Sequence, residues 1–76
     1  MNYAIYIQQA IGLIAKLKPG TIFTLPDLFG SAWNNIPKAY RLGFGREFKK
    51  QVDAGNIPNV KPIGKKSNNI WQYEKI

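Results

Sequence analysis

The fold is decided by residues 37–54, whose sequence is PKAYRLGFGREFKKQVDA. Large apolar side chains recur at every fourth position of this stretch, and at about 100° per residue they form one stripe of an amphipathic helix. The stripe consists of Tyr40, Phe44, Phe48 and Val52. The other side of the same helix carries the basic residues Lys38, Arg41, Arg46, Lys49 and Lys50.

The ends and the middle of this helix are marked by small residues. Gly55 after Ala54, with Pro58 beyond it, is a helix stop. Gly43 and Gly45 each weaken a helix by about 1 kcal/mol relative to alanine, so they mark either a break or a close backbone approach. We predict a continuous or slightly bent helix over 37–54.

Upstream of it, the chain predicts two further helices. Residues 3–17 carry apolar side chains at spacings of three or four, and Lys18-Pro19-Gly20 stops that helix. A short extended segment at 21–23 leads to Thr24, which is placed to cap a second helix with Asp27 at the capping-box position. This second helix ends at Gly30-Ser31.

Residues 31–35 are expected to connect the second and third helices. Asn34 and Asn35 are candidate N-caps for the third helix. Trp33 is expected to lie as a lid over the small core, and the alternative role for it is stacking on a nucleobase.

Downstream, the chain predicts a β-hairpin. Its strands are 57–63 and 69–75, and the turn between them, 64–68, carries Lys65 and Lys66. Pro58 and Pro62 restrict the first strand to an edge position. The whole order is helix, short strand, short helix, longer helix and hairpin. We therefore expect a single α+β domain over 1–76, a small winged helix-turn-helix with three helices and a C-terminal hairpin wing.

The residue inventory argues against an enzyme. The chain has no Cys and no His, so it has no disulfide, no thiolate nucleophile and no triad histidine. The four carboxylates suggest neither a zinc site nor a paired acid and base. We expect no metal, no cofactor and no small-molecule ligand. The N-terminal stretch lacks a leading positive charge and a long apolar run, so we expect neither export nor a membrane span, and a cytoplasmic location.

The charge is positive and unevenly distributed. The net charge is +7; residues 38–76 hold nine basic and three acidic residues, while residues 1–37 hold two basic and one acidic residue. A basic half on a small domain is typical of a polyanion binder. The predicted nucleic-acid-binding residues are Lys38, Arg41, Arg46, Lys49, Lys50, Lys65 and Lys66.

Three interpretations of this pattern stay open at the level of sequence. A basic helix beside a basic hairpin tip favours a duplex DNA-binding module, because the major groove admits one helix. A protein-binding adaptor or inhibitor of a host protein would instead use an exposed aromatic patch, for which Trp33 and Trp71 are the candidates. The cations would otherwise be only the solvated face of an amphipathic helix.

Parts of the chain resemble a known family of single-domain proteins of unknown function from Firmicutes and their phages or prophages. The most distinctive piece is Leu42-Gly43-Phe44-Gly45-Arg46-Glu47-Phe48, together with Asp27-Leu28-Phe29 upstream of it, and the resemblance spans about residues 21–75. The family pattern has a single glycine before the arginine, so one of the two glycines here is a departure. The resemblance implies a winged-helix-like fold and a mobile-element origin, such as a phage regulator of transcription or replication. It implies no activity. Its other matching positions are Phe23 to Pro26, Trp33, Arg41, Val52, Gly55, Gly64, Lys65, Asn68, Asn69 and Tyr73.

Overall fold

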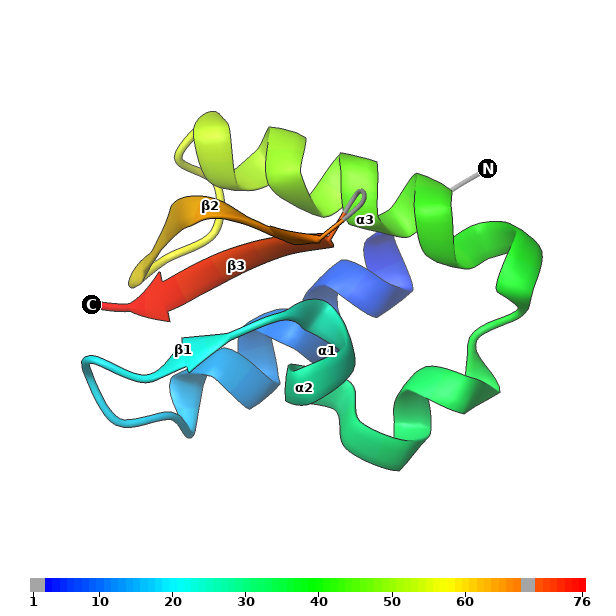
Figure 1. Ribbon diagram of the computed structural model, residues 1–76, viewed down its shortest axis with the longest axis horizontal. Helices are drawn as coiled ribbons and strands as arrows, with labels where there is room; N and C mark the ends of the chain where they lie inside the picture. The colour runs from blue at the N-terminus through cyan, green and yellow to red at the C-terminus, as the bar shows by residue number, and fades with distance from the viewer. Residues whose placement is uncertain (1–2, 68–69) are drawn as a thin grey trace.

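The computed structural model describes residues 3–67 and 70–76, and its chain combines helices with one small sheet (Figure 1). The α+β class predicted from the sequence is confirmed, with three α-helices and a three-stranded antiparallel sheet. A short 3-10 helix, η1, follows the second α-helix. In chain order the elements are α1 (Ala4–Ala15), β1 (Ile22–Phe23), α2 (Leu25–Phe29), η1 (Gly30–Asn35), α3 (Lys38–Asp53), β2 (Val60–Ser67) and β3 (Ile70–Lys75).

The sheet has the order β1-β3-β2, so the C-terminal strand lies in its centre. Tyr73 of β3 is opposite Phe23 on one side and Pro62 on the other. The strand that contains Pro62 is therefore an edge strand, as its proline predicts. Proline has no backbone N–H, so a strand that contains it cannot complete its hydrogen bonds to neighbours on both sides. In Figure 1, α3 runs alongside the β2–β3 hairpin, and α1 passes behind α2 and β1.

The apolar stripe of α3 is the centre of the core. Phe44 and Phe48 are fully buried and Val52 nearly so, as the spacing predicts, while Tyr40 is only half-buried. The Phe48 ring meets the Tyr73 ring edge to face, with centroids 5.0 Å apart, and therefore joins α3 to the central strand.

The start of α2 has the predicted capping box. The Thr24 side chain accepts a hydrogen bond from the Asp27 N–H at 3.2 Å, and the Asp27 carboxylate accepts one from the Thr24 N–H at 3.2 Å. These reciprocal bonds satisfy two backbone donors that a helix N-terminus otherwise leaves open.

The helix α3 is continuous through both of its glycines. At Gly43 the hydroxyl end of Tyr3 occupies the space that a Cβ would need, so this glycine is approached by a side chain from the N-terminal segment and not by a backbone. Gly45 has open space around it. Beyond the helix, Gly55 takes a φ of 79°, and the N–H groups of Gly55 and Asn56 bond back to Val52 and Gln51 at 3.0 Å, which closes the helix end.

The predicted boundaries of the hairpin were wrong on its first strand. That strand begins at Val60 and continues to Ser67, so Lys65 and Lys66 lie in the strand, outside any turn. Ile57 is buried in the core before the strand starts, and Asn59 turns the chain with a φ of 60°. The pairing continues past Gly64, with shifts in the register between Pro62 and Gly64 and between Lys65 and Ser67. Asn68 and Asn69, which the sequence predicts at the end of the turn and the start of the second strand, lie outside the described residues.

The predicted caps of α3 were also wrong. The helix starts after Pro37 with no side-chain cap, because η1 takes up Asn34 and Asn35. The connector and the helix are instead joined by the Arg41 side chain of α3, which donates hydrogen bonds to the carbonyls of Ile36 at 3.1 Å and Asn34 at 3.4 Å.

The end of α1 is tied to the sheet by a buried cation. The helix ends at Ala15, two residues earlier than predicted, and Lys75 donates from Nζ to the Ile14 carbonyl at 2.8 Å. A positive charge at this end complements the helix dipole. Among the residues described, no helix is long and apolar enough to span a membrane.

Candidate functional site

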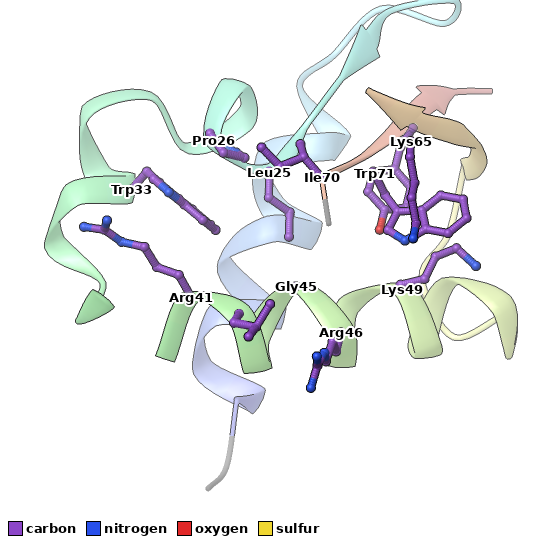
Figure 2. Close-up of a pocket in the computed structure, with 12 residues that line it drawn as sticks. Leu25, Pro26, Trp33, Arg41, Gly45, Arg46, Lys49, Lys65, Ile70 and Trp71 are labelled. Atoms are coloured by element: carbon purple, nitrogen blue, oxygen red, sulfur yellow. The ribbon is translucent and has the colours of Figure 1, made fainter. Parts of the chain in front are cut away.

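A groove of about 290 Å³ opens between α2, η1, α3 and the hairpin (Figure 2). Most of its surface is apolar, and its cationic side chains come from α3 and β2. None of the lining residues that the structure describes carries a carboxylate. They are Leu25, Pro26, Trp33, Arg41, Leu42, Gly45, Arg46, Lys49, Lys65, Ile70, Trp71 and Tyr73.

Both tryptophans of the chain line this groove. Trp33 packs against the core rings of Phe29 and Phe44, with centroids 6.0 and 6.1 Å away, as expected for a lid over the core. Trp71 lies on β3 beside α3. Figure 2 shows the two indoles on opposite sides of the groove, with Leu25 and Ile70 between them.

The indole of Trp71 contacts a lysine from the third helix and a lysine from the hairpin. The Lys49 ammonium lies over the Trp71 ring, 4.3 Å from its centroid, and the Lys65 ammonium lies 5.6 Å from it. The negative face of an indole attracts a cation, and Lys49 is also paired with Asp53 at 2.6 Å. The basic helix and the basic strand therefore meet in one surface, which sequence spacing alone does not establish.

The two arginines have different surroundings. Arg41, which the sequence places on the basic side of the helix, is half-buried and donates hydrogen bonds to the carbonyls of Ile36 and Asn34. Arg46 is exposed and has no ion pair or hydrogen bond within the described part of the chain. In Figure 2 it projects from α3 on the side away from Leu25 and Pro26. Arg46 is therefore the arginine available to a ligand.

The structure brings four of the seven predicted residues to the groove: Arg41, Arg46, Lys49 and Lys65. Lys38, Lys50 and Lys66 are exposed and do not line it. Lys49 lines the groove while it contacts both the Asp53 carboxylate and the Trp71 indole.

Sequence reasoning missed the exposed aliphatic residues of the groove. Leu42 is 50% exposed and Ile70 is 36% exposed. Leu42 carried a detectable signal: it lies two positions from Tyr40 and Phe44, about 200° around the helix and on the polar side. Ile70 carried no such signal, because its exposure depends on how the hairpin meets α3.

Tyr73 of β3 also lines the groove, although it is almost completely buried. Burial raises its pKa well above the ordinary value for tyrosine, and the negative charge of Asp53 adds to the same shift. The hydroxyl stays neutral at physiological pH, so it contributes no charge to the site. Within residues 3–67 and 70–76, no three acidic side chains cluster in a way that would hold a metal ion. The geometry instead suits a ligand that is negatively charged and partly apolar.

The chain matches the model of a domain of unknown function, DUF1413, over residues 8–75, and it belongs to this family. The predicted membership of a single-domain family of unknown function is thereby confirmed. No curated protein and no solved structure matches the chain.

Proposed function

We propose that this protein is a winged helix-turn-helix module that binds duplex DNA, with α3 in the major groove and β2 against the backbone beside it. The order of elements and the sheet order β1-β3-β2 support this topology, because α1, α2 and α3 precede a hairpin that forms the wing. The helix is 16 residues long and carries its basic side chains on the side away from the core. One such helix fits the width of the major groove.

The observation that carries the proposal is the meeting of two basic segments at Trp71. Lys49 of α3 and Lys65 of β2 lie around one ring, and the exposed cations Arg46, Lys50 and Lys66 extend the same two segments. A duplex presents closely spaced phosphates on both sides of its groove, so cations on a helix and on an adjacent strand can contact it together.

The resemblance to a family from Firmicutes and their phages or prophages supports a more specific role. We propose that the module regulates transcription or replication of a mobile element, in the cytoplasm of the cell that carries the element. A small size and a lack of catalytic inventory fit a regulator that acts by occupying DNA.

The test is a salt series of binding to a random duplex, with the double variant Lys65→Ala/Lys66→Ala. Because each lysine that neutralises a phosphate releases a counterion, the variant should flatten the slope of log affinity against log salt by about two units. Its affinity should fall alike on every sequence.

The matched control is Lys16→Ala/Lys18→Ala, which removes the same charge from two exposed lysines next to α1. The control should keep most of the parental slope. If the two double variants change the slope equally, binding depends only on net charge and the hairpin is not a specific contact. If the parent binds no duplex at low salt, the proposed function is wrong.

A further inference from the structure

Duplex binding leaves the apolar floor of the groove unexplained. Leu42, Ile70 and Pro26 line a hollow, whereas a duplex is convex and offers phosphates, sugars and base edges. In the proposed duplex complex, phosphates are contacted by the four cations at the rim of the groove, Arg41, Arg46, Lys49 and Lys65, and the apolar floor stays in contact with water. Exposed aliphatic side chains that line a concave site are typical of protein recognition.

We propose that this groove binds an acidic, amphipathic segment of a partner protein. An apolar side chain of that segment lies on Leu42 and Ile70, between the two indoles. Its carboxylates meet the cations of the rim, chiefly Arg46 and Lys65. The proposal goes beyond duplex binding and does not require it.

The positive charge of the residues that line the groove favours a negatively charged partner segment. Four cations line the groove, and the described lining residues include no acid. The carboxylate of Asp53, which pairs with Lys49, lies outside the lining. Arg46 has no fixed partner in the described residues, so a carboxylate of the bound segment gains a charge-assisted hydrogen bond without displacing an internal one. A basic or neutral segment would desolvate these cations without compensation.

The state of the indoles argues against a stacked nucleobase as the occupant. A base stacks on an uncovered ring face, whereas the Lys49 ammonium lies over the Trp71 ring, 4.3 Å from its centroid, and the Lys65 ammonium lies 5.6 Å from it. Trp33 is packed against Phe29 and Phe44. The two indoles therefore form the sides of the groove, and the apolar surface available to a ligand is that of the aliphatic residues Leu42 and Ile70. Tryptophan and arginine around an apolar pocket are also the residues that dominate binding energy in protein interfaces.

The experiment is a selection of short random peptides, displayed on a library, for binding to the full chain. We expect the enriched peptides to combine Asp or Glu with Leu, Ile or Phe. Synthetic versions without tryptophan are then titrated while the emission of the protein is recorded. Trp33 and Trp71 are the only tryptophans of the chain, so a change in emission reports on the groove itself.

Two variants block the groove by different routes. Leu42→Glu places a negative charge at an exposed position, and Gly45→Leu fills open space at the groove with a side chain. Each should weaken the enriched peptides by at least about tenfold. The matched control is Ile5→Glu, an exposed apolar residue on α1 that does not line the groove, and it should bind like the parent. Far-ultraviolet circular dichroism and a thermal melt establish that all three variants are folded.

Four results would overturn the proposal. These are enrichment of neutral or basic peptides, no enrichment above uncoated support, equal binding to Leu42→Glu and the parent, and a tryptophan response to oligothymidylate that Leu42→Glu abolishes while peptides give none. The last would assign the groove to a single-stranded nucleic acid. No duplex is present in this assay, so its failure is separate from failure of the proposed DNA binding.

Discussion

The helix α3 has an inward side that faces the core and an outward side that carries most of its basic residues. The two sides differ in how much their side chains are restrained by neighbouring residues. On the inward side, Phe44 and Phe48 are fully buried and contact rings from α1, α2 and β3. Among the basic residues on the outward side, Arg46 and Lys50 are exposed, whereas Arg41 and Lys49 have fixed partners within the described part of the chain. The inward side therefore determines stability, and the outward side is available for a ligand.

The positively charged side chains of this chain therefore have different roles. Lys75 is buried and holds the end of α1, Arg41 holds the connector, and Arg46 holds nothing in the described residues. The net charge counts these three equally, although only the last is free to bind. Substitutions made on one side of α3 at a time should separate stability from ligand binding.

The largest expected effect is on the inward side. Phe48→Ala should lower the free energy of unfolding by about 3–5 kcal/mol, because it removes a fully buried ring and leaves a cavity. In a domain of this size, that is a large part of the total stability. Urea denaturation measures the loss, with Phe48→Leu as the milder control. An unchanged midpoint for Phe48→Ala would show that the inward stripe is not the core.

On the outward side, Arg46→Ala and Arg41→Ala should affect DNA binding differently. Arg46→Ala should lose about 1–3 kcal/mol on a selected site and relax the preference there, because a free arginine can reach a base edge. Arg41→Ala should weaken selected and scrambled duplexes alike, because it removes one positive charge and the hydrogen bonds to Ile36 and Asn34, and neither depends on the base sequence.

Both arginine variants should be titrated against the selected and the scrambled duplex at one salt concentration. Small and equal losses on the two duplexes for Arg46→Ala would remove it from sequence readout. A loss of preference with Arg41→Ala would contradict the distinction drawn between the two arginines.

A substitution of Lys75 tests whether a buried cation contributes to stability, as the buried rings of α3 do. Lys75→Met should lower the free energy of unfolding by about 1–2 kcal/mol, because it removes a charge-assisted hydrogen bond at a helix C-terminus. Lys61→Met is the matched control on β2, an exposed lysine paired with Glu74 at 3.5 Å, and should change stability by about 0–1 kcal/mol. Equal effects of the two substitutions in thermal melts would show that burial of Lys75 contributes nothing.

The smallest expected effect is a pH dependence from Tyr73. In the unfolded chain its phenol ionises near pH 10, while burial keeps the folded phenol protonated to higher pH. Above about pH 10 the folded state thus binds more protons, so stability falls as pH rises, by at most about 1.4 kcal/mol per pH unit for one group. Tyr73→Phe lacks this contribution. Its stability should fall less than that of the parent between pH 9 and pH 11 in urea denaturation; equal falls would contradict the shift.

Features that depend on neighbours along the chain could be predicted from the sequence. The apolar stripe of α3, its continuity, the stop at Gly55 and the capping box of Thr24 and Asp27 all follow from spacings of a few residues. The edge position of β2 follows from Pro62. In each case the residue type itself restricts the backbone or the exposed face, so no distant part of the chain is needed.

Features that depend on distant contacts were decided only by the tertiary structure. The hairpin extends to Ser67 because β3 continues to pair with it, and Arg41 is held by hydrogen bonds to the carbonyls of Ile36 and Asn34. Trp33 and Trp71 lie far apart in the chain, and packing alone brings them to one groove. The order of the amino acids fixes which residues are apolar, basic or helix-forming. Only the fold decided which cations are free and which apolar side chains stay exposed, because both depend on the three-dimensional neighbours that bury or satisfy a side chain.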